Sequence, residues 1–305
     1  MDGIKTVIKN VGQPLGAILA KMPQHFAEQT REIRIAAGRP IRLNFQKEGV
    51  FIGRSGGECT ADSDKDRLAP QEIQNTFAAL CKYSVHTYQK DICEGFVTTD
   101  GGIRVGICGT AVYENEKIIN VKDISALNIR IAREIKGVSD EIFRSTGDFW
   151  KTGLLVAGPP CSGKTTVLRD IARQLGNKGI CTCVVDERME IAGMYRGLPG
   201  FDIGACTTVL NGYRKSDGII SAVRAMSPQA VICDEFGGEK EIEASLFAMK
   251  SGIGIIASMH CLNFEELSGK KELSMLIKNG VFEWAALMKS GGGIEKIIKA
   301  EELIK

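Results

Sequence analysis

The chain has 305 residues, 44% of them hydrophobic and 25% charged, which is enough for two domains that each bury a core. Its net charge of +2 gives no electrostatic argument for nucleic-acid binding, and no run of about 18 apolar residues predicts a transmembrane helix. The N-terminus carries no secretory signal pattern, and none of the ten cysteines forms a C-x-x-C pair. These features predict a cytosolic protein with reduced thiols.

The first half of the chain predicts a mixed α+β domain. Apolar residues at helical spacing predict helices over 11–30 and over 70–83, and the polar stretch 56–67 predicts a loop. Alternating and β-branched runs predict strands over 32–36, 41–45, 50–52, 95–121 and 125–131, with hairpin turns at 100–102 and 114–116.

The second half alternates apolar strands with helical segments, which is the pattern of a parallel sheet covered by helices. Residues 135–150 contain two glycines and predict a helical or linker segment. The predicted organisation is therefore a smaller N-terminal α+β domain over 1–134, a linker over 135–150, and an α/β domain over 151–305.

Residues 158–165, with the sequence GPPCSGKT, fit the phosphate-binding pattern G-x-x-x-x-G-K-[ST]. An apolar strand over 153–157 precedes them and a helix over 164–175 follows, so backbone N–H groups and the helix dipole converge on an anion. Lys164 is expected to reach the β- and γ-phosphates of ATP or ADP, and the Thr165 hydroxyl to bind Mg²⁺. The predicted nucleotide-binding residues of this segment are Gly158, Pro159, Pro160, Cys161, Ser162, Gly163, Lys164, Thr165 and Thr166.

Two acidic residues, Asp234 and Glu235, follow the apolar run 230–233. In open α/β sheets, ligands bind at the carboxyl ends of the strands, so these carboxylates should lie near the phosphate loop. Asp234 is interpreted as the Walker B aspartate that holds Mg²⁺, and Glu235 as the base that activates water. The alternative interpretation is a helix N-cap, a common position for acidic residues.

Other polar residues also follow predicted strands. His260 is a candidate γ-phosphate sensor, with a purely structural histidine as the alternative. Asp186 and Glu187 are candidates for a second acidic site at the edge of the nucleotide, and the alternative is a surface pairing with Arg188.

Phosphoryl transfer gains from a guanidinium that meets the charge developing on the γ-phosphate. The candidate arginines are Arg130, Arg133, Arg214 and Arg224, and each of them could equally be a surface or interdomain charge.

Motifs in both halves make the chain resemble the stage III sporulation protein AA family, a branch of the secretion-ATPase superfamily that includes type II and type IV secretion motors. The matching pieces are EIRIAAGRP at 32–40, RVGICG at 104–109, SALNIRIAR at 125–133, the phosphate loop at 158–166, VDER at 185–188, VRAMSP at 223–228 and ICDEFGG at 232–238.

This resemblance implies a RecA-like P-loop ATPase core in the second half, with an acidic "Asp box" at 185–188 and a "His box" at 258–260. It implies a homo-hexameric ring in which arginines of the N-terminal domain, Arg130 among them, reach the phosphates. It also implies a mother-cell protein that works with the cytosolic segments of membrane proteins in a sporulation channel complex, which could recruit it to the membrane. No cysteine cluster of the zinc-module kind occurs, so no metal beyond Mg²⁺ is expected.

The leading hypothesis is therefore an oligomeric ATPase with Glu235, Lys164, His260, Arg130 and Arg224 as catalytic residues. One alternative is a nucleotide-gated scaffold with little turnover. Another is a nucleic-acid-stimulated RecA-like ATPase, which the low net charge and the 6% aromatic content do not favour. A small-molecule kinase is a weaker option, because no acceptor-site motif is visible.

Overall fold

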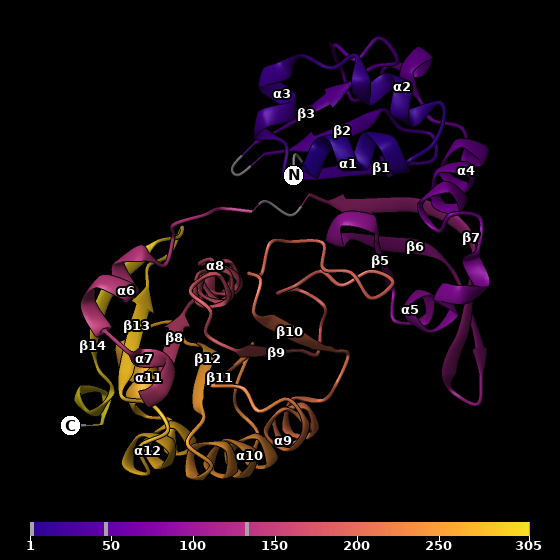
Figure 1. Cartoon of the computed structure of the whole chain (residues 1–305). Coiled ribbons are helices and arrows are strands. Elements are labelled where there is room, and N and C mark those ends of the chain that lie inside the picture. The colour runs from indigo at the N-terminus through magenta and orange to yellow at the C-terminus, as the bar shows by residue number, and fades with distance from the viewer. Residues whose placement is uncertain (1–2, 46–47, 132–133, 305) are drawn as a thin grey trace. The chain divides into compact units, whose positions relative to one another are not determined.

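A computed structural model describes residues 3–45, 48–131 and 134–304. The chain divides into two compact units, shown in Figure 1: unit 1 consists of Met1–Arg133 and Tyr195–Gly200, and unit 2 of Glu134–Met194 and Phe201–Lys305. The sequence predicted one uninterrupted second domain over 151–305. The difference arises because an alternating pattern locates strands and helices but does not say where a long connection packs.

Unit 1 is built on an antiparallel sheet whose described strands run in the order β4-β3-β2-β1-β7-β6-β5. The strands are β1 (Glu32–Ala36), β2 (Ile41–Asn44), β3 (Gly49–Ile52), β4 (Glu58–Cys59), β5 (Phe96–Thr99), β6 (Ile103–Glu114) and β7 (Lys117–Arg130). Both predicted hairpin turns are confirmed, because they join β5 to β6 and β6 to β7. Ile33 and Ile35 of β1 point into the core, so their polar neighbours in sequence line the other face.

Helices cover the core side of this sheet. They are α1 (Gly3–Asn10), α2 (Leu15–Ala20), α3 (Gln24–Gln29), α4 (Pro70–Leu80) and α5 (Gln89–Cys93). The predicted single helix over 11–30 is wrong, because Pro14 and Pro23 stand at the N-caps of α2 and α3 and end any continuous helix. Tyr195 packs against this core, and its hydroxyl lies 3.1 Å from the hydroxyl of Tyr88.

Unit 2 is built on a mostly parallel sheet whose described strands run in the order β10-β9-β11-β12-β8-β13-β14. The strands are β8 (Leu154–Gly158), β9 (Thr182–Asp186), β10 (Thr207–Asn211), β11 (Ala230–Cys233), β12 (Gly254–His260), β13 (Trp284–Met288) and β14 (Ile294–Lys299). Only the pairing of β14 with β13 is antiparallel among these strands. The predicted parallel α/β architecture is confirmed.

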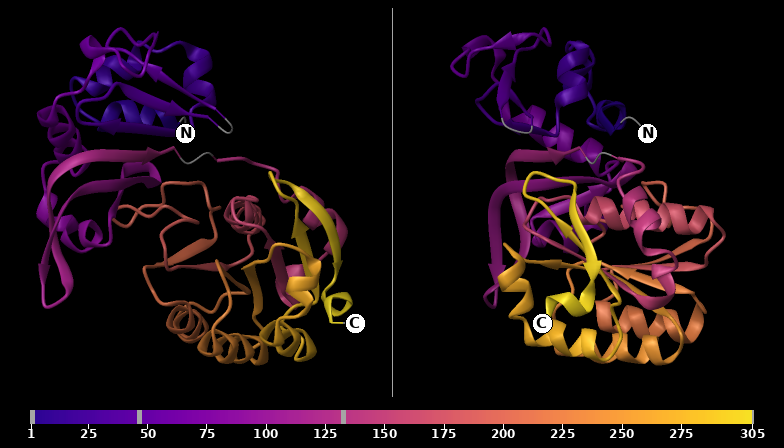
Figure 2. Two further views of the ribbon diagram at one scale, coloured as in Figure 1. Left: turned by 180° about the vertical axis from the view of Figure 1, so that it is seen from behind. Right: turned by 90° about the vertical axis from the view of Figure 1, so that its left-hand side faces the viewer.

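Helices cover both faces of this sheet, as Figure 2 shows from behind and from the side. One layer contains α6 (Asp140–Thr146), α7 (Phe149–Thr152) and α8 (Lys164–Asn177), and the other contains α9 (Lys215–Ala225), α10 (Glu239–Lys250), α11 (Phe264–Ser268) and α12 (Lys271–Lys278). Successive residues of β8 alternate between the two layers: Leu154 and Val156 contact the first, and Leu155 and Ala157 the second.

Residues 135–150, predicted as a helical or linker segment, are largely helical and belong to unit 2. Ile142 of α6 and Phe149 of α7 are fully buried in the layer that also contains α8. The two glycines of the segment, Gly137 and Gly147, have positive φ and lie at turns beside α6 rather than in a flexible stretch.

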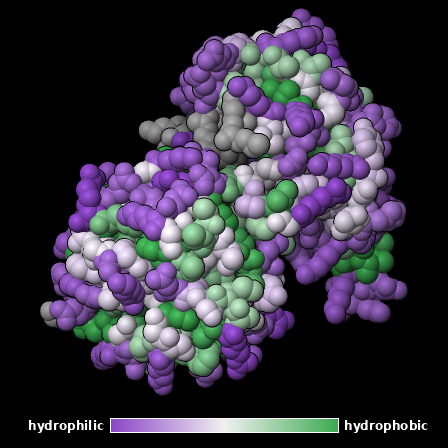
Figure 3. All heavy atoms as spheres, in the orientation of Figure 1, coloured by the Kyte–Doolittle hydropathy of each residue, from purple (hydrophilic) through white to green (hydrophobic). Residues whose placement is uncertain are grey.

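Hydrophilic residues cover most of the molecular face seen in Figure 3, with hydrophobic residues scattered between them. Among the described residues, no helix combines the length and the apolar composition that crossing a membrane requires.

Candidate active site

The phosphate loop connects β8 to α8, as the sequence predicted. Gly158 ends the strand where a Cβ would come within 2.7 Å of the Met288 side chain, so a larger residue does not fit. Gly163 adopts φ 94° just before the helix, a conformation that glycine adopts without strain. The Ser162 hydroxyl is buried without a hydrogen-bond partner among the described residues, as expected of a loop whose polar atoms bind an anionic ligand.

Lys164 lies at the start of α8 with only 5% of its surface exposed. Its Nζ donates to the carbonyls of Gly158, at 2.9 Å, and Pro159, at 2.8 Å, and lies 3.0 Å from Nδ1 of His260. Burial lowers the pKa of Lys164, while the carboxylate of Asp234 opposes that shift. The ammonium is thus held over the loop by carbonyls that a phosphate oxygen can replace.

Thr165 and Asp234, the two predicted Mg²⁺ ligands, lie side by side. The Thr165 hydroxyl donates to Oδ2 of Asp234 at 2.9 Å, and the Ser258 hydroxyl on the neighbouring strand β12 donates to Oδ1. Hydroxyl and carboxylate oxygens are the hard ligands that Mg²⁺ prefers, so the donor set fits the ion. The parallel register of β11 and β12 brings Asp234 and Ser258 together, because Cys233 pairs with Ala257.

Glu235 follows Asp234 and has φ 44°, in the left-handed region that is unfavourable for a non-glycine residue. Its Oε1 lies 2.9 Å from Nε2 of His260, and its other oxygen pairs with Arg188. Burial alone raises the pKa of Glu235, but the His260 hydrogen bond and the Arg188 charge outweigh burial and hold the pKa below its usual value. The carboxylate is therefore ionised at neutral pH and able to accept a proton from water.

His260 connects the phosphate loop to the acidic pair. The Lys164 ammonium can only donate a hydrogen bond, so Nδ1 of His260 is the acceptor. Nε2 of His260 therefore carries the ring proton and donates the hydrogen bond to Oε1 of Glu235. The register places His260 beside Gly158, at the carboxyl ends of adjacent strands. Lys164, His260 and Glu235 thus form one continuous line of contacts, as the sequence predicted for a shared sheet edge.

Asp186 differs from its predicted role as a nucleotide ligand. It is 2% exposed. Its carboxylate accepts hydrogen bonds of 2.8–3.2 Å from the backbone N–H groups of Glu190, Ile191 and Ala192. Burial raises its pKa, and these N–H groups act in the opposite direction. Both oxygens thus hold the turn after β9, so the geometry assigns this residue a structural role.

Glu187 and Arg188 follow Asp186 at the end of β9. Glu187 lies 3.6 Å from the Lys215 ammonium, while Arg188 pairs with Glu235 rather than with Asp186 or Glu187. From the sequence, Arg188 was expected as a possible surface partner of Asp186 and Glu187. Its actual partner belongs to another strand end, which only the order β9-β11 in the sheet reveals.

The predicted arginines are dispersed. Arg224 lies in the last turn of α9, about 14 Å along the helix axis from Lys215 in the first turn, and stands over the ring of Phe247. This is the end of α9 away from the strand ends, so the structure does not bring Arg224 to the active site of its own chain. Arg214 is exposed at the N-cap of α9, and Arg133 falls outside the described residues.

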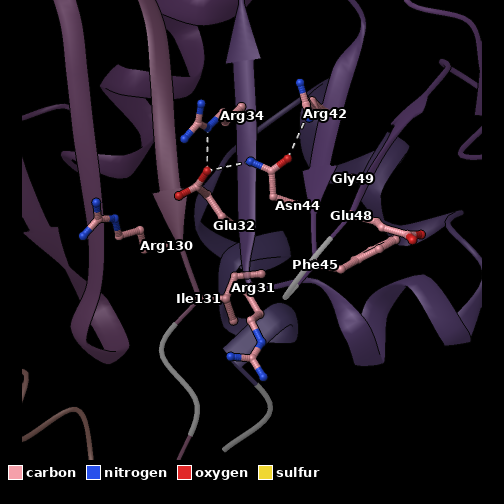
Figure 4. A pocket seen from close by; sticks show the side chains of 10 residues that line it. All are labelled: Arg31, Glu32, Arg34, Arg42, Asn44, Phe45, Glu48, Gly49, Arg130 and Ile131. Atoms are coloured by element: carbon pink, nitrogen blue, oxygen red, sulfur yellow. Dashed lines mark hydrogen bonds and ion pairs between the residues drawn. The ribbon is translucent and has the colours of Figure 1, made fainter. Parts of the chain in front are cut away.

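Arg130 belongs to unit 1, where it lines a cavity of 630 Å³ on the open face of the sheet (Figure 4). Arg31, Arg34 and Arg42 line the same cavity. Glu32 lies among them and accepts hydrogen bonds from Arg34 and from two asparagines. The cavity is therefore rich in guanidinium groups, which suit phosphate and carboxylate oxygens.

Residues 5–300 match the family model described as "Sporulation stage III, protein AA". The chain belongs to this family. It is 32% identical to Stage III sporulation protein AA of Bacillus subtilis (strain 168) over 270 residues, which cover 87% of this chain and 84% of that relative.

Two solved structures share the fold. The ATPase DotB of Legionella pneumophila has a TM-score of 0.57 at 16% identity and covers 87% of this chain and 73% of its own. The pilus retraction motor PilT, solved with bound ADP, has a TM-score of 0.58 at 14% identity and covers 90% of this chain and 81% of its own. The fold is thus that of the RecA-like secretion ATPases.

Proposed function

We propose that the chain is a Mg²⁺-dependent ATPase that converts ATP and water to ADP and phosphate. The observation that carries the proposal is the line of contacts from Lys164 through His260 to Glu235, with Asp234 hydrogen-bonded to the Glu235 backbone. This cluster supplies a cation for phosphates, oxygen ligands suited to Mg²⁺, and an ionised carboxylate. The fold shared with the ATPase DotB supports the same reaction.

In the proposed reaction, Lys164 exchanges the carbonyls of Gly158 and Pro159 for oxygens of the β- and γ-phosphates, and the backbone N–H groups at the start of α8 bind the same phosphates. Bound Mg²⁺, held through Thr165 and Asp234, supplies neutralising charge at the phosphate oxygens. Glu235 orients the attacking water and accepts its proton.

His260 links the two ends of this machinery, because it contacts both Lys164 and Glu235. When Lys164 turns to a phosphate, Nδ1 of His260 loses its donor. We therefore assign His260 the role of γ-phosphate sensor, since its hydrogen bonding changes with the occupant of the loop and bears directly on Glu235.

The biological role that we propose is to energise the assembly or operation of a sporulation channel across the forespore membranes, as a homo-hexameric ring. Membership of the sporulation family supports the process, and the fold shared with the retraction motor PilT supports mechanical work. In this proposal the protein acts in the mother-cell cytoplasm. Its partners are cytosolic segments of membrane proteins of that complex, which recruit it to the membrane.

The decisive experiment measures Mg²⁺-dependent phosphate release by the wild type and by Glu235→Gln. Glutamine keeps the shape of the side chain but cannot accept the proton, so we expect turnover to fall about 10²–10⁴-fold while ATP still binds. Equal and negligible rates in both proteins, under conditions where the protein assembles, would refute the ATPase. Stimulation of the wild type by single-stranded DNA would favour the nucleic-acid alternative instead.

In a ring of copies, we propose that Arg130 supplies the guanidinium that meets the charge on the γ-phosphate. Arginine fingers contribute about 10³–10⁵ to turnover, so Arg130→Ala should lower kcat strongly and nucleotide affinity much less. Arg42→Ala, which removes another guanidinium from the same cavity, is the matched control. Equal turnover of Arg130→Ala and wild type would move the role to another arginine.

A further inference from the structure

Lys215 is a half-buried lysine that the reaction described above does not use. It begins α9, and only 12% of its side chain is exposed. Its Nζ donates to the main-chain carbonyl of Glu235 at 2.7 Å. An ammonium that is largely withdrawn from water needs partners for its charge and its N–H groups, and here one of the partners is the backbone of the proposed catalytic base.

The backbone of Glu235 is held on both sides. Its N–H donates to Oδ1 of Asp234 at 2.9 Å and lies 3.1 Å from the Ser258 hydroxyl, while its carbonyl accepts from Lys215. A residue with φ 44° keeps this strained conformation only when its surroundings impose it. The conformation determines the direction of the side chain, and therefore the contact between the carboxylate and His260.

Lys215 also connects the segments around Glu235. Its Nζ lies 3.6 Å from the carboxylate of Glu187 at the end of β9 and 3.5 Å from that of Glu241 in the first turn of α10. The Glu241 carboxylate in turn accepts hydrogen bonds from the backbone N–H groups of Gly237 and Gly238, at 2.8 and 3.1 Å. The chain segment that leaves β11 is therefore tied to Lys215 at Glu235 and, through Glu241, at the two glycines.

We propose that Lys215 is a positioning residue for Glu235: it fixes the main chain of the base, and so the place of its carboxylate, without contacting the reacting atoms. This inference rests on the proposed ATPase function. A displacement of about 1 Å in a catalytic group can cost a hundredfold in rate, which is why a hydrogen bond to the main chain controls turnover.

The test compares Lys215→Met, which keeps an unbranched side chain and removes the ammonium, with the wild type. We expect kcat to fall at least about tenfold, and by no more than the 10²–10⁴ that a positioned base contributes. The dissociation constant of a fluorescent ATP analogue should change less than about twofold, because Lys164 and the loop are untouched. Lys215→Arg keeps a donor for the carbonyl and should recover most of the lost turnover.

Lys240→Met is the matched control, because Lys240 is an exposed lysine that lines, together with Lys215, a cavity of 390 Å³. It should leave both kcat and the dissociation constant of the ATP analogue unchanged.

The double variant Lys215→Met/Glu235→Gln separates positioning from an independent effect. If Lys215 acts through Glu235, its removal lowers turnover no further once the carboxylate is gone. A full additional loss in the double variant, or an unchanged kcat in Lys215→Met, would overturn the proposal, as would an equal loss of nucleotide affinity and turnover. If Lys215→Met does not fold, Lys215→Gln carries the test: its shorter, uncharged side chain should lower kcat twofold or more with little change in nucleotide affinity, and an unchanged kcat overturns the proposal.

A wild type without turnover is a different result, since it removes the ATPase proposal itself and this inference with it. A wild type that hydrolyses ATP, combined with a Lys215→Met variant of equal kcat, leaves the ATPase standing and removes only the positioning role.

Discussion

The sheets of unit 1 and unit 2 place their polar side chains in different ways. In the antiparallel sheet, residues directly opposite each other share a face, so Glu32 of β1 lies next to Arg130 of β7, which in turn pairs with Arg104 of β6. In the parallel sheet the faces are covered by helices, and the polar residues of the proposed active site lie at the strand ends. One sheet therefore displays an arginine-rich face, and the other gathers its chemistry along an edge.

This comparison shows what each sheet suits. An open face of guanidinium groups offers area and positive charge, which fits recognition of an anionic surface or group. The carboxyl ends of parallel strands bring residues as distant in sequence as Lys164 and Glu235 into one hydrogen-bonded cluster. Such a cluster suits chemistry at a single atom.

Removal of the Lys164 ammonium tests the proposed active site at the carboxyl ends of the parallel strands. Lys164→Ala should weaken nucleotide binding about 10- to 100-fold and abolish turnover, because a hydrogen bond to a charged group contributes about 1.5–3 kcal/mol. Titration of a fluorescent ATP analogue and a phosphate-release assay measure the two effects. Lys178→Ala, at the other end of α8, should change neither. Tight binding and full activity in Lys164→Ala would contradict the assignment.

Asp170, in the helix α8 that follows the phosphate loop, tests how that helix is held in unit 2. Its side chain is 1% exposed and accepts hydrogen bonds from the Ser139 N–H and hydroxyl, at 2.9 and 2.7 Å, and from Arg173. Asp170→Asn should lower the free energy of unfolding of unit 2 by about 2 kcal/mol, because the asparagine amide cannot accept all of these donors. Thermal unfolding with and without nucleotide measures the loss, and Asp140→Asn, at the start of α6, should cost much less.

The pH dependence of the same residue has a defined sign. Burial raises the pKa of Asp170, but the hydrogen bonds from Ser139, Arg173 and Gln174 outweigh burial and leave the pKa below its usual value of 3.8. A carboxylate whose folded pKa is lowered stabilises the protein above the unfolded pKa and loses that contribution as pH falls through the folded pKa. Asp170→Asn should therefore flatten the acid side of the stability curve of unit 2 below about pH 4.

Glu32 tests the open face of the other sheet, with a smaller expected effect. Burial raises its pKa, while the hydrogen bonds from Asn44, Arg34 and Asn128 more than compensate, so its pKa lies below 4.5. By the same sign, its contribution to unit 1 is present above that value and is lost at lower pH. Glu32→Gln should cost about 1 kcal/mol at neutral pH and less at pH 3, measured by hydrogen exchange in β1 and β7. A cost that is constant with pH would contradict the assignment.

The phosphate loop and each pair of acidic residues at a strand end could be predicted from the sequence, because the residues within each motif are neighbours along the chain. The convergence of Asp234, Glu235 and His260 near Lys164 also followed, since parallel strands end at one edge. The predicted helix over 11–30 is wrong because Pro14 and Pro23 interrupt the chain of backbone hydrogen bonds that its apolar spacing alone would favour. The contacts of Asp186 with its own turn and of Arg224 with Phe247 did not follow from the sequence, because burial and helix length, rather than residue type, decide them.

The sequence by itself determined the residue types of the site and the strand-loop-helix unit that presents them, because local pattern and backbone chemistry dictate both. Only the tertiary structure decided the partners: Arg188 with Glu235, Lys215 with the Glu235 carbonyl, and Asp186 with the backbone of its own turn. These contacts depend on which strands are neighbours and on their register. Both are set by packing across the whole sheet, which no short stretch of sequence records.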